Sequence, residues 1–337
     1  MSLQGVALEH YRDRERLVRG VDRVASQTWR RVDPGSIAAS WRSLLPAVLA
    51  ALVGAQRLAA GAAGGYVSAA LVEQGLPTAA EGRVVVDALT GVASDGRDLA
   101  SLLYRPVVTS LVAIQGGTST TRALAGGEAA LRMIVGTQVA DAGRAADQVA
   151  LTARPAVSGY RRMLVGRSCS RCVILAGRWY RYNRGFDRHP RCDCTHVPAR
   201  EDTGQDVSTN PRKYFDSLSA AEQDRAFTAA GAEAIRLGAD INQVVNARRG
   251  MSTAGPPGRR RLVAVDAFGQ RVYVTSEGVT TRGVAGRRLG ARETGTRAGG
   301  GRYRSARVPR LMPETILAVA DDREDAVRLL RRHGYIT

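Results

Sequence analysis

The sequence predicts a predominantly helical α+β protein with an N-terminal helical arm or bundle, a small cysteine-containing α/β unit, a β-hairpin and C-terminal helices. Two observations predict this class. Apolar residues recur at intervals of three and four, whereas alternating β-branched runs are rare. Hydrophobic residues make up 44% of the chain but aromatic residues only 5%, so alanine, leucine and valine must do most of the packing. The 337 residues suffice for two or three domains with a sizeable core.

The first half of the chain carries the pattern of packed helices. Apolar periodicity predicts helices over residues 4–31, 36–61, 95–114 and 121–151. The turn Asp33-Pro34-Gly35 ends the first helix, and Ser36 can cap the second. We therefore expect residues 1–165 to form a helical arm or bundle, whose many alanines and glycines permit close approach of another helix or of a partner.

The same half holds the most apolar run, residues 44–56, between Arg42 and Arg57. Its thirteen residues are too few to span a bilayer, so we expect a buried helix there. The N-terminus is charged and lacks an apolar segment followed by a cleavage site. These features predict a soluble protein with no membrane anchor, made in a cytoplasm where thiols stay reduced.

Charge is distributed unevenly along the chain. The formal net charge is +18, and Lys213 is the only lysine among 49 basic residues. Residues 1–150 hold 15 basic against 13 acidic residues, whereas residues 151–337 hold 34 basic against 18 acidic ones. Codon bias explains arginine over lysine, but it does not explain an excess in one half. The asymmetry predicts a polyanionic partner, either nucleic acid or an acidic protein face.

All four cysteines lie in one short segment, residues 166–198, together with two of the four histidines. Cys169 and Cys172 form a C-x-x-C motif, and a C-x-C motif follows. The candidate ligands are Cys169, Cys172, His189, Cys192 and Cys194. Thiolates and imidazoles at such spacings are typical of a tetrahedral Zn²⁺ site. The pattern thus predicts a zinc-stapled unit that includes a strand pair in residues 173–182, turning at Ala176-Gly177.

Other interpretations of the cysteines are weaker. Two disulfides conflict with a reducing compartment. A redox C-x-x-C motif requires a thioredoxin-like βαβ context, which the flanking sequence does not show. A catalytic metal needs an open position and a general base, and no His-Glu pair accompanies the cluster. We expect a structural zinc.

The remainder of the chain alternates helices with basic segments. Ser219 with Glu222 forms a capping box, Gly238 is a helix stop, and Asp240 can cap a short following helix. A hairpin is predicted over residues 262–275, turning near Phe268-Gly269. Residues 281–310 contain nine arginines and one acid, Glu293, and predict an extended, flexible basic strip. Two helices end the chain, with a capping box at Asp321 and Glu324 and a stop at Gly334.

These features divide the chain into four segments. The predicted segments are a helical region 1–165, a cysteine segment 166–255, a hairpin and basic strip 256–312, and a C-terminal helical unit 313–337. Diffuse arginines suit contacts with phosphates without base reading. The candidate contact residues are Arg259, Arg260, Arg261, Arg287, Arg288, Arg302 and Arg304.

Three stretches together resemble a known family. They are the C-x-x-C motif with the H-P-x-C-x-C motif after it, residues 214–251, and residues 310–336. They are similar to the head-morphogenesis proteins of phage Mu, the MuF-like minor capsid proteins of tailed phages. The resemblance covers about residues 150–337. It implies a minor virion component inside the capsid at the portal vertex, with the portal protein as partner, and a role in head assembly and genome delivery. The major capsid protein and packaged double-stranded DNA are the further partners that we expect.

Two alternatives follow from the same residues. Some MuF-like proteins carry the label of capsid maturation protease, but a Ser-His-Asp hydrolase needs a histidine base. The candidates are His10, His189, His196 and His333, two of which lie on charged terminal helices and two in the cysteine cluster. A zinc-dependent nucleic-acid-binding regulator should instead show a recognition helix, and no helical run separates the ligand pairs. We therefore expect a virion protein without enzymatic activity.

Overall fold

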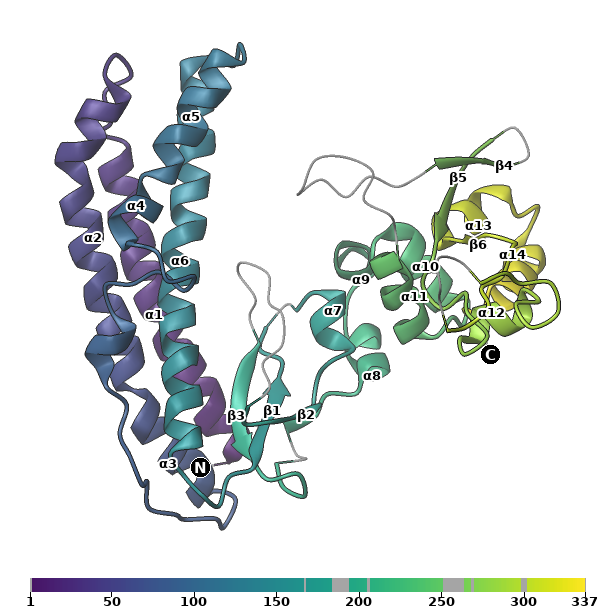
Figure 1. The fold of residues 1–337 in the computed structure, drawn as a ribbon, viewed down its shortest axis with the longest axis horizontal. Coiled ribbons are helices and arrows are strands. Elements are labelled where there is room, and N and C mark those ends of the chain that lie inside the picture. Colours follow the sequence, from purple (N-terminus) through teal and green to yellow (C-terminus); the bar gives the residue numbers. More distant parts are fainter. Residues whose placement is uncertain are drawn as a thin grey trace. The chain divides into compact units, whose positions relative to one another are not determined.

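A computed structural model describes residues 2–166, 168–183, 194–204, 207–250, 264–267, 270–297 and 302–336 (Figure 1). The chain divides into two compact units, each of which is considered by itself. Unit 1 comprises Met1–Ser168 and Ala176–Thr209, and unit 2 comprises Cys169–Leu175 and Asn210–Thr337. As the sequence predicts, the chain is predominantly helical with two small sheets.

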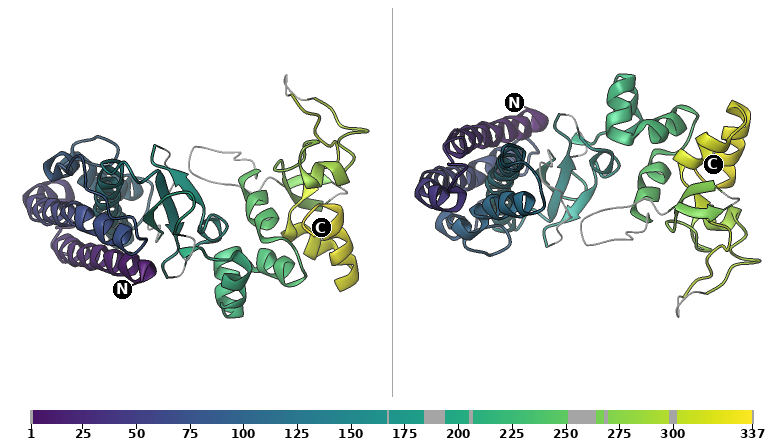
Figure 2. Two further views of the ribbon diagram at one scale, coloured as in Figure 1. Left: turned by 90° about the horizontal axis from the view of Figure 1, so that it is seen from below. Right: turned by 90° about the horizontal axis from the view of Figure 1, so that it is seen from above.

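Unit 1 is built on long helices that run alongside one another (Figures 1 and 2). Its helices are α1 (Leu3–Trp29), α2 (Ile37–Gly61), α3 (Ala63–Val72), the 3-10 turn η1 (Val86–Leu89), α4 (Leu99–Leu103), α5 (Arg105–Gln115) and α6 (Thr120–Thr152). The predicted helices are confirmed, except that residues 95–114 form two helices. Tyr104 separates α4 from α5, and Pro106 occupies the first turn of α5, where its missing N–H costs no helical hydrogen bond.

The turn between α1 and α2 is fixed by Asp33. Its carboxylate accepts hydrogen bonds from the Gly35 N–H at 2.9 Å and from the Ser36 hydroxyl at 2.6 Å. These bonds, the Ser36 one first, lower the pKa of Asp33. Ser36 precedes α2 as predicted, but its hydroxyl serves Asp33 and does not cap the helix.

Close packing at one end of the bundle depends on Gly127 of α6. A Cβ atom there would collide with the Ser110 hydroxyl of α5 and with the Trp29 ring of α1. The Trp29 ring meets Trp41 of α2 edge to face, with 4.9 Å between centroids. Trp41 is fully buried and donates to the Leu103 carbonyl at 3.1 Å. A glycine near the start of the 33-residue helix α6 therefore leaves room for the two tryptophan side chains of this core.

A three-stranded antiparallel sheet completes unit 1. Its strands are β1 (Gly159–Met163), β2 (Trp179–Arg181) and β3 (Thr195–Ala199), in the order β2-β1-β3. Tyr160 lies opposite Tyr180 on one side and Pro198 on the other. The predicted strand pair in residues 173–182 is wrong. Val173 ends helix α7 (Ser170–Val173), so only the second half of that segment is a strand, and its partner is β1.

Unit 2 consists of short helices and a second sheet. The helices are α7, α8 (Pro211–Asp216), α9 (Ala220–Phe227), α10 (Ala229–Arg236), α11 (Ile241–Ala247) with the 3-10 turn η3 (Arg248–Gly250), α12 (Val284–Arg288), α13 (Pro313–Val319) and α14 (Arg323–Arg332). The sheet has the order β4-β5-β6, from β4 (Ala264–Ala267), β5 (Gln270–Thr275) and β6 (Arg310–Leu311). The hairpin is confirmed, and its turn at Phe268-Gly269 lies outside the described residues.

Caps end and start these helices largely as predicted. The Ser219–Glu222 capping box is present, Asp240 accepts from the Gln243 N–H at 2.8 Å, and Gly238 adopts a φ of 100°. The last helix differs by one residue. Asp322, and not Asp321, accepts from the Asp325 N–H at 2.8 Å. The capping box predicted from Asp321 and Glu324 is therefore wrong.

Residues 281–310 differ most from expectation. The sequence predicts an extended strip, whereas the described residues 281–297 and 302–310 are folded against the rest of unit 2. Helix α12 starts it, and Ser305 forms isolated β-bridges with Thr280 and Thr296. The glycine backbone is used for close approach, since a Cβ at Gly286 would collide with the Thr280 carbonyl. The basic segment is thus part of the folded body of unit 2.

Candidate functional site

The C-x-x-C motif is a preformed pair of thiols. Cys169 precedes the single turn of α7 and Cys172 lies within it, which brings the two sulfurs to 3.4 Å. Two thiolates on one tetrahedral Zn²⁺ lie about 3.8 Å apart, given Zn–S bonds of about 2.3 Å. Cys172 is buried and Cys169 is half-buried. The spacing of this pair therefore fits two ligands of one zinc ion.

Of the three other candidate ligands, the structure describes one, Cys194. Cys194 is buried and lies just before β3, in unit 1. His189 and Cys192 lie outside the described residues. Among the residues that the structure describes, no group of three or more His, Cys, Asp or Glu residues is placed to hold a metal. Geometry thus supplies two ligands of the expected four.

The folded basic segment presents most of its arginines to solvent. Eight of the nine arginines in residues 281–310 are exposed: Arg282, Arg287, Arg288, Arg292, Arg297, Arg302, Arg304 and Arg307. Tyr303 lies between two of them, with the guanidinium of Arg282 at 5.2 Å and that of Arg302 at 5.8 Å from its ring centroid. Both guanidiniums are thus within cation–π distance of a single aromatic ring. Arg259, Arg260 and Arg261 lie outside the described residues.

Two arginines of the segment, Arg288 and Arg310, have structural roles that the net charge of the segment does not reveal. Arg288 donates to the carbonyls of Arg331 at 2.6 Å and Ile336 at 2.8 Å. Arg310 is 1% exposed and packs its guanidinium 4.3 Å from the centroid of Tyr335. Arg288, predicted to contact DNA, is thereby tied to the end of α14.

Arg310 is bonded almost entirely to backbone oxygens. It donates to the carbonyls of His333 and Glu277, both at 2.9 Å, and of Gly334 at 3.4 Å. Its remaining bond goes to the Gln243 side chain at 3.2 Å. Burial lowers the pKa of Arg310. Arg310 therefore neutralises the negative end of the α14 dipole from inside the core.

His333 lies in the same core. Its Nδ1 accepts a hydrogen bond from the Leu311 N–H at 3.2 Å. Burial, with smaller contributions from Arg332 and Arg310, lowers the pKa of His333 to about 4. The ring is thus a neutral acceptor at pH 7 and joins β6 to the end of α14.

A buried polar network in unit 1 was missed by sequence reasoning, which placed His10 on a charged surface helix. Asp147 of α6 accepts from His10 at 2.9 Å and from Arg14 at 3.1 Å. The His10 ring stacks on Tyr66 of α3 at 3.8 Å, and Arg14 reaches the Thr195 hydroxyl of β3 at 3.4 Å. All of these side chains are buried. The i, i+4 spacing of His10 and Arg14 was the available signal, because it places both on one helix face.

This network resembles the base and orienting acid of a hydrolase, but its contacts are structural. One ring nitrogen of His10 is hydrogen-bonded to Asp147, and the His10 ring is stacked on Tyr66. Burial raises the pKa of the Tyr66 phenol. The Tyr66 hydroxyl donates to the His196 carbonyl of β3. These contacts fasten the helices of unit 1 to its sheet.

The outer face of α2 and α3 is apolar and exposed. The segment Ile37–Val72 is long and apolar enough to cross a membrane by length and composition, with a mean hydropathy of 1.6 over its best window. Only 22% of that stretch is buried, so the run 44–56, which was expected to be buried, is buried on one face of α2 and exposed on the other. Its exposed positions repeat every three or four residues and are mostly small. They include Ser43, Ala47, Ala50, Gly54, Leu58, Gly61, Gly65, Ala69 and Val72, which we call the small-residue seam.

The fold is that of a predominantly helical α+β protein with an exposed apolar helical face in unit 1 and an arginine-rich surface in unit 2. The family model described as VG15 protein matches residues 4–221. The chain belongs to this family, which is viral and phage-associated, and it is therefore a phage virion-related protein. No curated protein and no solved structure is similar enough to the chain to count as a match. The matched region includes α1 from its second residue through α6, although the resemblance seen in the sequence covered only about residues 150–337.

Proposed function

We propose that the chain is a minor capsid protein of the MuF-like, head-morphogenesis type. In this proposal unit 1 binds the portal protein inside the phage head, and unit 2 contacts packaged DNA. Both actions serve assembly and genome delivery at the portal vertex, without enzymatic activity of the chain itself. Membership of a phage-associated family supports the setting, and the two surfaces described above support the division of roles.

The small-residue seam is the observation that carries the portal contact. Between residues 37 and 72 the only charged side chains are Arg42 and Arg57. Small side chains let a second helix approach closely, and an uncharged exposed face loses little hydration when covered. An exposed apolar helical face of this length is typical of a protein interface.

A protein partner is favoured over a membrane because the opposite face of the helix is already committed. Trp41, Val48 and Leu52 are fully buried in the bundle core. The Gln56 side chain of the same face is also buried, donates to the Val92 carbonyl at 3.2 Å and accepts from the Gly91 N–H at 3.0 Å. Insertion into a bilayer would have to break these contacts and carry an amide into hydrocarbon. Docking of another helix leaves them intact.

The exposed arginines of unit 2 support the DNA contact. The described part of residues 281–310 has eight exposed arginines and one exposed acidic residue, Glu293. Guanidiniums bind phosphates without reading bases, and the half-buried Tyr303 offers a ring for stacking on a base or sugar. We expect DNA binding that is independent of sequence and weakens steeply with salt.

A structural zinc is part of the same proposal. Cys169 and Cys172 would hold the ion with two of His189, Cys192 and Cys194. The ion would supply folding energy to residues 166–198, because its ligands do not form a site in the unfolded chain. Elemental analysis of purified protein should give one zinc per chain, and Cys169→Ser should abolish it. Metal-free protein with intact secondary structure would contradict this part.

Portal binding is tested by adding charge to the seam. Ala47→Glu with Ala50→Glu places two carboxylates on exposed positions of α2. Co-purification with the cognate portal protein should fall at least tenfold while the melting temperature is unchanged. The matched control is Ala125→Glu with Ala129→Glu, which adds the same charge to exposed positions of α6. Equal portal binding by both variants would contradict the assignment, as would sedimentation of the wild-type protein with lipid vesicles.

A further inference from the structure

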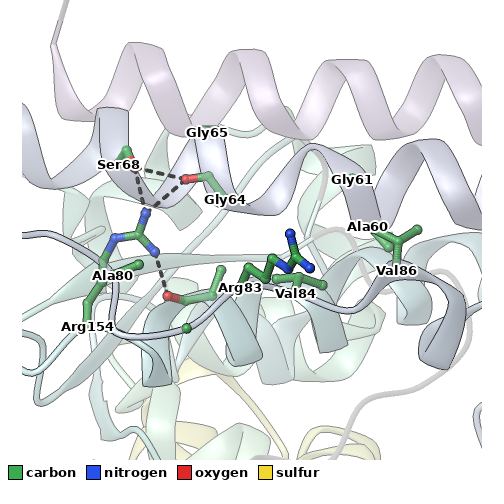
Figure 3. A pocket seen from close by; sticks show the side chains of 12 residues that line it. Ala60, Gly61, Gly64, Gly65, Ser68, Ala80, Arg83, Val84, Val86 and Arg154 are labelled. Atoms are coloured by element: carbon green, nitrogen blue, oxygen red, sulfur yellow. Dashed lines mark hydrogen bonds between the residues drawn. The ribbon is translucent and has the colours of Figure 1, made fainter.

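A pocket in unit 1 lies between α3, the loop before η1 and the end of α6 (Figure 3). Its volume is about 390 Å³, which falls in the range of small-ligand sites. Gly61, Gly64 and Gly65 line one side, so the helix backbone itself forms that wall. Val84 and Val86 make part of the opposite wall. The pocket is thus mostly apolar, with two arginines in it.

The first arginine, Arg154, is 6% exposed and is held by neutral groups alone. It donates to the carbonyls of Ala150 at 2.7 Å and Gly64 at 3.2 Å, and to the Ser68 hydroxyl at 2.6 Å (Figure 3). Its Nε is buried and makes no hydrogen bond with any residue that the structure describes. Burial alone lowers the pKa of Arg154.

The second arginine, Arg83, extends into the same space from the loop (Figure 3). Within the described part of the chain it forms neither a hydrogen bond nor an ion pair. Arg57 of α2, in contrast, forms an ion pair with the carboxylate of Asp87 at 2.7 Å. Two guanidiniums therefore line one pocket while neither has a carboxylate partner.

A buried cation such as Arg154 is normally paired, because an uncompensated charge in an apolar site is costly, whereas Arg83 is exposed and carries no such penalty. A bound anion would remove that cost, and guanidiniums match oxyanions in charge and hydrogen-bond geometry. The glycines leave room for the ligand next to the helix, since a Cβ at Gly64 or Gly65 would meet no atom within 4 Å.

We propose that this pocket binds a small ligand through an oxyanion, a phosphate or carboxylate group, seated between Arg83 and Arg154. The apolar remainder of the ligand lies against Val84, Val86 and the glycine wall. This site shares Gly61 and Gly65 with the small-residue seam, but its ligand is a small oxyanion and not a protein or DNA, so it goes beyond the proposed function.

The test is calorimetric titration of the full-length protein with three probes: pyrophosphate, glutarate and, as a reference anion, chloride. We expect saturable binding of pyrophosphate or glutarate but not of chloride, and the probe that binds identifies the group. Arg83→Gln should weaken that binding at least tenfold. Gly64→Leu should abolish it by filling the pocket, without lowering the melting temperature.

The control is Arg57→Gln, which removes a neighbouring exposed arginine that does not line the pocket. It should bind the probe as the wild type does. Arg154→Gln is a weaker test, since it also removes the bonds to α3. Absence of saturable binding by both probes overturns the proposal, and so does binding that survives Arg83→Gln and Gly64→Leu. Retained portal and DNA binding by Gly64→Leu would show that the pocket acts separately.

Discussion

Two buried arginines, Arg14 of unit 1 and Arg310 of unit 2, are accommodated in opposite ways. In unit 1 the buried Arg14 is neutralised by a carboxylate, Asp147, which also binds His10. In unit 2 the buried Arg310 has backbone carbonyls and one amide as its hydrogen-bond partners. A single substitution can remove the carboxylate that pairs with Arg14, whereas it cannot remove the backbone carbonyls that bind Arg310. Unit 1 should therefore be sensitive to loss of one acid, and unit 2 to protonation of the histidine beside its arginine.

Loss of Asp147 should have the largest effect. Asp147→Ala leaves Arg14 buried without its counter-ion and removes the partner of His10. Breaking a buried pair from one side costs about 3–5 kcal/mol. Denaturant unfolding of the full chain, read by hydrogen exchange in α1 and α6, measures this loss.

The matched control for Asp147 is Asp22, which also pairs with an arginine between α1 and α6. Its bond to Arg132 is 2.7 Å but the pair is partly exposed. Pairs of that kind contribute about 0–1 kcal/mol. If Asp147→Ala costs no more than Asp22→Ala, the buried network does not fasten unit 1.

Acid should weaken unit 2 through His333. The pKa of His333 is about 4 in the folded chain, below its ordinary value of 6.5. Above pH 6.5 the ring is neutral in both states. As the pH falls from 6.5 to 4 the unfolded state takes up the proton first, so stability falls by up to about 3 kcal/mol and then levels off. Hydrogen exchange of α14 across this range measures the change.

His333→Asn supplies the control for acid sensitivity. Asparagine keeps an acceptor for the Leu311 N–H but does not titrate in this range. The variant should lose the part of the pH dependence that lies between pH 6.5 and 4. An unchanged profile in α14 would assign the sensitivity to other groups.

A smaller effect is expected at Gly127. Gly127→Ala gains helix propensity but forces a methyl group against Trp29 and Ser110, for a net cost of about 1–3 kcal/mol. Gly126→Ala is the matched control, because a Cβ there meets no atom within 4 Å. That substitution should stabilise α6 by up to about 1 kcal/mol. Equal melting temperatures for the two variants would contradict the close approach at Gly127.

Local signals made most of the helices predictable from sequence. The Asp33-Pro34-Gly35 turn, the Ser219–Glu222 box and Gly238 act through neighbours in the chain. The strands β1 and β3 were not predictable in this way. They are five residues each, and β3 pairs with a strand more than thirty residues earlier, so their pattern depends on distant partners.

The candidate sites differ in the same way: those formed by neighbouring residues were predictable from the sequence, and those formed by distant residues were not. The C-x-x-C pair was predictable because i, i+3 spacing alone brings Cys169 and Cys172 together. Arg310 and Arg302 look alike in the sequence, yet one is buried and the other exposed, because only the fold decides which arginine meets the end of α14. The His10–Asp147 pair joins residues 137 positions apart, and no local pattern reports such a partner.

The central claim is that unit 1 binds a protein and unit 2 binds phosphates, and one crossed binding experiment tests it. The seam variant, Ala47→Glu with Ala50→Glu, is compared with an arginine variant, Arg302, Arg304 and Arg307→Gln, which spares the structural Arg288. A charge-matched control replaces the exposed Arg12, Arg19 and Arg23 of α1 with Gln. Each is assayed for portal co-purification and for gel shift of two unrelated DNA sequences.

We expect the seam variant to lose binding to the portal protein and to retain its affinity for DNA. The arginine variant should still bind the portal protein but should lose affinity for both DNA sequences equally. The slope of log affinity against log salt concentration should become shallower by up to about 0.9 for each phosphate contact removed. The control should behave as the wild type. If the arginine variant instead binds DNA normally and loses the portal, the basic surface is a protein-docking site and the division of roles is wrong.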